Sequence, residues 1–110
     1  MIDVGKEMLR INPQTNAIES SRDSRNWIRR CMSKSYGTFK DLCLFGSCVY
    51  AVTSKGVYYS RDNGLNWMTK CVTQAYGEFQ TIMAHGTELY AQTTKGLYAS
   101  RDNGLNWIRK

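Results

Sequence analysis

Hydrophobic and polar residues alternate in short runs along most of the chain, and the runs are separated by glycine, serine and asparagine. The clearest set of runs covers residues 39–45, 48–53, 57–60 and 66–72. Alternation of this kind, with aromatic and β-branched residues, is typical of half-buried strands, and Asn63-Gly64 between two of the runs is a strong hairpin signal. The pattern therefore predicts four short antiparallel strands joined by tight turns.

The whole pattern returns after 40 residues, as the spacing of Trp27, Trp67 and Trp107 shows. The run SRDNGLNW at residues 60–67 recurs unchanged at residues 100–107, and nearly half of the positions between the tryptophans are identical. Strands are therefore expected again at residues 79–84, 88–93, 97–100 and 106–110. Four strands in about 40 residues is the period of one β-propeller blade, so the chain is predicted to be all-β with about three blades.

The repeat divides a single domain, residues 1–110, into units at residues 1–30, 31–70 and 71–110. The first unit is degenerate, because only residues 2–4 remain to form its first strand. Its turn at residues 21–27 is one residue shorter than the others and lacks the glycine. We therefore expect a blade with a clipped first strand, followed by two complete four-stranded antiparallel blades.

The two copies of SRDNGLNW resemble the Asp-box, or BNR repeat, in which Ser, Asp, Gly and Trp stand at fixed spacing and Thr or Ser precedes the Trp. Both copies depart from this pattern at one position, where they have Asn66 and Asn106. The resemblance covers nearly the whole chain and implies a β-propeller of the sialidase-like, sortilin-like or photosystem-assembly-factor-like kind. It implies a structural role for Ser60, Asp62, Gly64, Trp67, Ser100, Asp102, Gly104 and Trp107.

The residue types of this motif suit a structural role. A short carboxylate such as Asp62 accepts hydrogen bonds from backbone N–H groups of its own turn. Gly64 adopts a positive φ without a Cβ clash, and Trp67 buries a large ring between neighbouring sheets. The resemblance further implies that a ligand binds in the central channel or on the loop face opposite these turns.

A chain of 110 residues is too short to close a propeller alone, because closed propellers have about 4–8 blades. An open stack of three blades leaves two large apolar faces exposed, and such faces mark interfaces. We expect closure by homo-oligomerisation, with a homodimer of six blades favoured. The alternatives are another oligomer, a hetero-assembly and a piece of a longer protein.

The formal net charge is +6, but the basic residues are spread along the chain, which does not favour a nucleic-acid surface. No apolar run approaches the roughly 18 residues of a membrane span, and the first residues lack the layout of a signal peptide. A cytoplasmic location without a membrane partner is therefore expected. Four cysteines without a Cys-x-x-Cys motif predict neither a zinc site nor another cofactor. Cys43 is expected either in the apolar core or in a hairpin disulfide with Cys48.

Loops on the face opposite the SRDNGLNW turns carry repeated lysine and tyrosine residues. Ammonium groups beside phenol hydroxyls suit an anionic or polyhydroxyl ligand. We therefore predict ligand contacts at Lys34, Tyr36, Lys55, Tyr76 and Lys95. Their repetition also fits a purely structural role, in which Tyr-Gly packs in a turn and Lys-Gly forms a solvated turn.

These features favour a non-catalytic, lectin-like binding module for a glycan or another small anion, such as a nucleotide or a phosphorylated metabolite. The alternative is a scaffold that docks an acidic protein partner. A sialidase-like glycoside hydrolase is less favoured, because the chain lacks a recognisable arginine triad, Tyr/Glu pair and separate acid. Asp41 and Glu78 are candidates for a carboxylate pair, but nothing in the sequence couples them.

Overall fold

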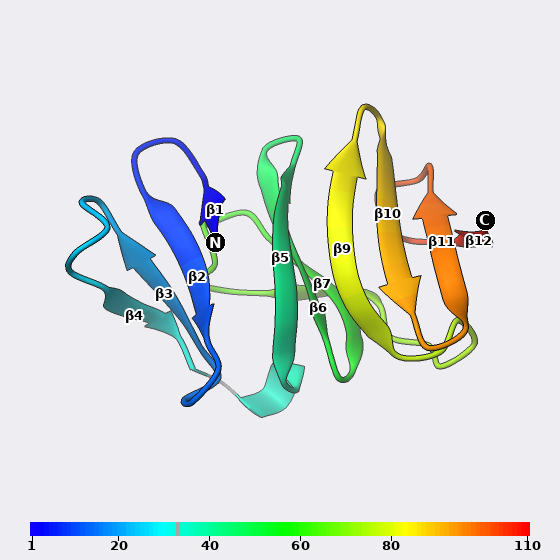
Figure 1. Cartoon of the computed structure of the whole chain (residues 1–110), viewed down its shortest axis with the longest axis horizontal. Coiled ribbons are helices and arrows are strands. Elements are labelled where there is room, and N and C mark those ends of the chain that lie inside the picture. The colour runs from blue at the N-terminus through cyan, green and yellow to red at the C-terminus, as the bar shows by residue number, and fades with distance from the viewer. Residues whose placement is uncertain (33) are drawn as a thin grey trace.

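The computed structural model describes residues 1–32 and 34–110, and in this part of the chain twelve strands form three antiparallel sheets (Figure 1). Each sheet has four strands paired in sequence order. The first sheet contains β1 (Ile2–Asp3), β2 (Met8–Asn12), β3 (Ala17–Ser21) and β4 (Ile28–Cys31). The second contains β5 (Phe39–Phe45), β6 (Cys48–Thr53), β7 (Gly56–Ser60) and β8 (Met68–Cys71). The third contains β9 (Phe79–His85), β10 (Glu88–Thr93), β11 (Gly96–Ser100) and β12 (Ile108–Arg109).

The prediction of an all-β chain built from four-stranded antiparallel units is confirmed. The strands lie within a few residues of their expected ranges. The clearest difference is at the fourth strands, because β8 begins after Trp67 and β12 begins after Trp107. Both indoles belong to the preceding turn, where they donate hydrogen bonds to turn carbonyls. A short 3₁₀ helix, η1 (Lys34–Tyr36), in the connection from the first sheet to the second was not expected.

Because successive strands run in opposite directions, the loops of each sheet are divided between two edges (Figure 1). The loops after the first and third strands lie at one edge, which we call the turn edge. It holds both SRDNGLNW turns. The loops after the second and fourth strands lie at the opposite edge, the crossover edge, which also holds η1 and the connections between sheets.

The sheets stand side by side and pack face to face (Figure 1). One hydrophobic cluster lies between the first and second sheets, and another lies between the second and third. Residues of β6 contribute alternately to the two clusters: Val49 and Ala51 to the first, Tyr50 and Val52 to the second. Both faces of the second sheet are therefore buried, as the nearly continuous apolar sequence of β6 requires.

The third sheet leaves one face without a neighbouring sheet in the described part of the chain. On this open face, Met83 and Leu97 occupy the register positions of Cys43 and Val57 in the second sheet. Cys43 and Val57 are buried, whereas Met83 and Leu97 are 59% and 40% exposed. The third sheet thus keeps apolar side chains at positions that the second sheet buries.

The open face of the first sheet is polar where the second sheet is apolar. Arg10 and Glu19 stand in register with Ala51 and Tyr58. The guanidinium of Arg10 bonds Glu19 at 2.9 Å and lies 4.0 Å from the centre of the Trp27 ring. This hydrogen bond from Arg10 lowers the pKa of Glu19. The ion pair and the cation–π contact cover the half-buried ring of Trp27. The corresponding ring of the second sheet, that of Trp67, is buried.

The first SRDNGLNW turn is closed by its own side chains. Asp62 Oδ1 accepts the Ser60 hydroxyl at 2.7 Å and the N–H of Asn66 at 2.9 Å. Ser60 Oγ accepts the N–H of Gly64 at 2.9 Å, and the indole of Trp67 donates to the Gly64 carbonyl at 3.0 Å. The side-chain amide of Asn66 donates to Asp62 Oδ2 at 2.8 Å, which accounts for asparagine at this position. The corresponding hydrogen bonds of the second copy join Ser100, Asp102, Gly104, Asn106 and Trp107.

The shorter turn of the first sheet keeps the same arrangement around its carboxylate. Asp23 Oδ1 accepts the N–H groups of Asn26 and Arg25, each at 2.9 Å, and the Ser21 hydroxyl at 3.0 Å. These hydrogen bonds, that of Asn26 foremost, lower the pKa of Asp23. Ser24, with a φ of 63°, takes the place of the asparagine, and the glycine is the residue that is missing. The turn therefore keeps the hydrogen bonds around the carboxylate but is one residue shorter than the other two turns.

Gly64 brings the turn of the second sheet onto the first sheet. Its φ is +89°, and a Cβ there would lie 3.1 Å from Cγ2 of Ile18. We therefore expect Gly64→Ala to lower the free energy of unfolding by about 1–3 kcal/mol. Gly46→Ala is the matched control, because Gly46 also has a positive φ but faces open space. Urea denaturation measures both variants, and equal losses would contradict the contact between the sheets.

Asp62 and Asp102 link the stability of the chain to pH. Burial raises the pKa of Asp62, but the hydrogen bonds that it accepts outweigh burial and bring it below the ordinary value of 3.8. For Asp102, the largest cause is the hydrogen bond from the N–H of Asn106, which lowers its pKa. A carboxyl with a lowered pKa stabilises the fold above its unfolded pKa, and this contribution is lost as the pH falls through the folded pKa.

We therefore expect Asp102→Asn to lower the free energy of unfolding by about 1 kcal/mol near pH 6, with solvent screening keeping the loss small. Near pH 3 the loss is expected to be smaller, because this lies below the ordinary pKa of 3.8, where the carboxyl of the unfolded chain is protonated and the charge contributes less to folding. Chemical denaturation at both pH values measures the difference. A loss that is the same at both values argues against a role for the charge.

Candidate functional site

The two tyrosines predicted to contact a ligand pack against the hydrophobic clusters. The ring of Tyr36 lies 5.3 Å from that of Tyr58, edge to face, and the ring of Tyr76 lies 5.3 Å from that of Tyr98 in the same way. The Tyr76 hydroxyl also accepts the N–H of Trp107 at 3.4 Å. Both phenols are half-buried, so their described contacts are structural. Their predicted contact with a ligand stays a prediction.

The two predicted lysines that the structure describes in full lie at the crossover edge. The ammonium of Lys55 donates to the Ser35 carbonyl at 3.1 Å, and that of Lys95 donates to the Ala75 carbonyl at 3.4 Å. Both side chains are exposed, so each could also meet an anion. Lys34 belongs to η1, and its side chain lies outside the described residues.

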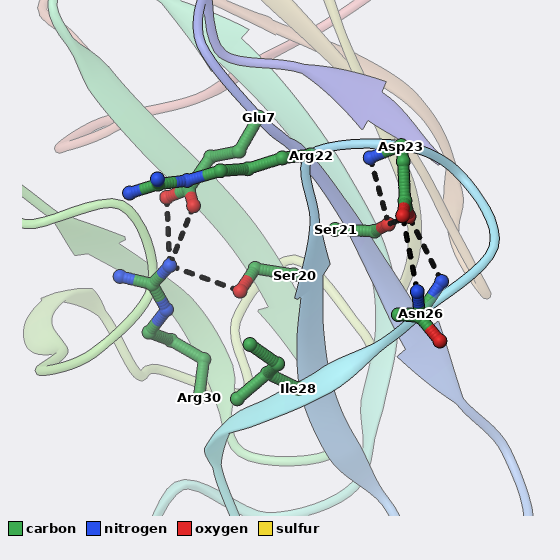
Figure 2. A pocket seen from close by; sticks show the side chains of 8 residues that line it. All are labelled: Glu7, Ser20, Ser21, Arg22, Asp23, Asn26, Ile28 and Arg30. Atoms are coloured by element: carbon green, nitrogen blue, oxygen red, sulfur yellow. Dashed lines mark hydrogen bonds and ion pairs between the residues drawn. The ribbon is translucent and has the colours of Figure 1, made fainter.

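A cleft that the sequence did not suggest opens at the turn edge, between the first sheet and the turn of the second. It consists of two hollows of about 340 and 350 Å³ that share Glu7, Arg22 and Arg30. The first hollow is completed by Ser20, Ser21, Asp23, Asn26 and Ile28, which Figure 2 shows from close by. The second is completed by Val4, Lys6 and Asn63. We call the two hollows together the arginine cleft.

Arg30 is held at the wall of the arginine cleft by three hydrogen bonds. Its Nη2 donates to both carboxylate oxygens of Glu7 at 2.7 Å and to the Ser20 hydroxyl at 2.9 Å (Figure 2). The side chains of Arg30 and Glu7 are 26% and 12% exposed. Arg22 extends along the cleft towards the Glu7 carboxylate in Figure 2. The cleft therefore combines one fixed guanidinium with a second that reaches across it.

The position of Ser20 is the local reason for the hollow. In strand register, Ser20 corresponds to Tyr59 of the second sheet, and Arg30 corresponds to Lys70. There, the Lys70 ammonium lies 4.3 Å from the centre of the Tyr59 ring, which packs against the hydrophobic cluster. A serine hydroxyl fills much less space than a phenol ring. The first sheet therefore has a cleft where the second sheet has an aromatic side chain.

Asp41 and Glu78, the carboxylates considered as a pair, join the innermost strands of two sheets. Asp41 Oδ2 on β5 accepts the N–H of Ile82 on β9 at 2.9 Å. Glu78, just before β9, forms an ion pair with Lys40 of β5. The contacts of both carboxylates therefore connect the second sheet to the third.

All four cysteines have free thiols. Cys43 is buried and stands in register with Tyr50, so it occupies the expected core position and the hairpin disulfide with Cys48 is absent. Burial raises the pKa of the Cys43 thiol to about 12 and also raises the pKa of Cys71. Within residues 1–32 and 34–110, no three His, Cys, Asp or Glu side chains gather to hold a metal ion. No helix in these ranges is long and apolar enough to cross a membrane.

The sequence did not point to the arginine cleft, because Arg29-Arg30 is a basic pair of the kind that is usual on a solvated strand face. The available signal was the loss of the aromatic residue at position 20 beside two conserved cationic positions of the repeat. Arg22 corresponds to Arg61 and Arg101, and Arg30 to Lys70 and Lys110. In the first sheet the two cations are kept and the ring between them is lost, so the cations border a hollow between this sheet and the turn of the second.

No protein-family model matches the sequence, and a comparison with curated proteins finds no match. The likeness of the SRDNGLNW turns to the Asp-box therefore stays a prediction from the motif itself.

The bond between Glu7 and Arg30 is expected to contribute to stability, because both side chains are largely buried. A double-mutant cycle with Glu7→Gln and Arg30→Gln should give a coupling energy of about 1–2 kcal/mol in the free energy of unfolding. Removing either partner alone leaves the other partly buried charge without its ion pair. Thermal or urea denaturation of the four proteins measures the coupling. Strictly additive losses are inconsistent with this bond.

Proposed function

We propose that the chain and a second copy of itself form a closed six-bladed Asp-box β-propeller. The assembly would serve as a non-catalytic binding module for a glycan or another small anion. The observation that carries this proposal is that both faces of the second sheet are buried, whereas the first and third sheets each have an open face. In a ring, every sheet has two neighbours, as the second sheet has here.

The open face of the third sheet supports a further sheet as its neighbour. Met83 and Leu97 are exposed apolar residues at positions that are buried in the second sheet, and Tyr90 stands in register with the buried Tyr50. Adjacent exposed apolar side chains are typical of an interface. A second copy of the chain is the favoured neighbour for this face. The first sheet of that copy also has an open face, and it belongs to the same repeat as the sheets that already pack together here. Two copies give six blades, within the usual range of closed propellers.

A binding role agrees with the charge of the chain. The formal net charge is +6, which favours anionic ligands. Lys55 and Lys95 are exposed at the crossover edge, so the predicted site there remains part of the proposal. The contacts of Asp41 and Glu78 join sheets, which supports a module without acid–base chemistry at these carboxylates.

The outermost strands support a second candidate function, a scaffold for an acidic protein partner. Ile28, Met68 and Ile108 occupy the same position in β4, β8 and β12, and all three are exposed. Basic residues follow them in each strand. A repeated exposed apolar residue beside positive charge suits a polar-rimmed protein interface.

The mass in solution tests the ring. Light scattering at micromolar concentration is expected to give twice the mass of the chain. Met83→Lys places a charge on the open face of the third sheet, where it would have to be desolvated, so we expect this variant to shift towards the monomer. Met68→Lys is the matched control, because Met68 is exposed on an outermost strand of the second sheet. It should keep the wild-type mass.

Two results would overturn the ring: a wild-type monomer at this concentration, or equal masses for the two variants. Thermal-shift measurements with sugars and nucleotides then separate the two functions. A small-molecule site raises the melting temperature, because the ligand binds only the folded chain. A broad panel without any shift favours the protein scaffold.

A further inference from the structure

The repeat contains two cationic positions whose surroundings differ from sheet to sheet. In the second sheet, the charged groups of Arg61 and Lys70 lie 5.8 and 4.3 Å from the centre of the Tyr59 ring. The ring stabilises both cations through its π face. In the first sheet the corresponding cations are Arg22 and Arg30, and the ring is replaced by Ser20. Two guanidiniums thus border a hollow in place of an aromatic ring.

The charges around this hollow are not balanced. Lys6, Arg22 and Arg30 line the arginine cleft, and Glu7 is the carboxylate that bonds one of them. Asp23 also lines it and stays negatively charged, because the hydrogen bonds that its two oxygens accept within its own turn lower its pKa. Three cations against two carboxylates leave an excess of one positive charge around the cleft, which favours an anion.

Several donors of the cleft have no partner within the described residues. Arg22 and Lys6 are exposed, and neither forms a hydrogen bond or an ion pair there. Arg30 uses only Nη2 for Glu7 and Ser20, so its Nε and Nη1 groups are also available. The bond to Glu7 fixes the guanidinium plane before a ligand arrives. A guanidinium held in place and a second, exposed guanidinium suit recognition of a tetrahedral oxyanion from two sides.

We propose that the arginine cleft binds a phosphate monoester, with Arg22 and Arg30 bonding the phosphate oxygens and Lys6 adding charge. The first hollow, of about 340 Å³, has room for the phosphate and a small organic group. Ile28, which is 70% exposed, offers that organic group an apolar contact. The cleft lies at the turn edge, so this site is distinct from the one proposed at Lys55 and Lys95 on the crossover edge, and it requires neither that site nor the ring.

The test is an NMR titration of the full chain with glycerol 3-phosphate at constant ionic strength. Saturable shifts of the amides around Arg22 and Arg30 are expected, with no response to glycerol. Inorganic phosphate should bind several-fold more weakly, because it lacks the organic group. Equal affinity for inorganic phosphate would overturn the assignment to a monoester, and the absence of saturable binding would overturn the site.

Arg22→Gln is the decisive variant, because Arg22 has no described partner and its loss should leave the fold intact. We expect it to weaken glycerol 3-phosphate binding by about tenfold or more. Arg61→Gln changes the equivalent residue of the second sheet and should leave the affinity within about twofold. Equal effects of the two variants would show only general attraction to a basic chain and would overturn the proposal.

A second variant tests the hollow itself. Ser20→Tyr restores the residue of the second sheet and should abolish binding by filling the space between the cations. Retained affinity in a folded Ser20→Tyr protein would contradict the site. Light scattering on the same samples separates this proposal from the ring: a monomer that binds the ester overturns only the ring, and a dimer that does not bind it overturns only the site.

Discussion

A four-stranded sheet of about 40 residues cannot bury a hydrophobic core within itself, and the rest of this structure depends on that constraint. Each sheet is one layer thick, so its apolar side chains are buried only where another layer covers them. The second sheet meets this requirement on both faces through the alternating residues of β6. The turns obey it too, because Gly64 and Trp67 bring the turn of the second sheet onto Leu9 and Ile18 of the first.

Features that depend on residues close in sequence were predicted well. The strand ranges followed from alternation, and the hydrogen bond to the Asp62 carboxylate and the positive φ of Gly64 followed from residues that act within one loop. Features that depend on which side chains pack against one another in the folded chain were not predicted. From the sequence alone, Tyr36 could present its hydroxyl to a ligand or pack its ring into the fold. The structure shows that its ring lies against Tyr58. The start of β8 also depended on the indole of Trp67 staying in the turn.

The arginine cleft belongs to the second kind of feature, because it arises from a side chain that is missing. A basic strand such as β4 reads as a solvated face until the register shows that its partner on β3 is Ser20. The three sheets share one backbone arrangement and differ in their side chains. At one equivalent position they have Ser20, Tyr59 and Ala99. The repeat that predicts the fold therefore also contains the comparison that reveals the cleft, once strand pairing shows which positions share a face.

The hydrogen bond between Asp41 and Ile82 occupies a backbone N–H group on β9 that another strand could otherwise use. β9 is an edge strand of its sheet, so alternate N–H groups along it point away from β10 and could pair with a strand of another chain. Asp41 occupies one of these donors with a carboxylate from β5, and the ion pair of Lys40 with Glu78 adds charge beside it. An intruding strand would have to break both contacts and leave charged groups unpaired. The contact that joins two sheets therefore also occupies a backbone donor through which another strand would add to the edge of β9.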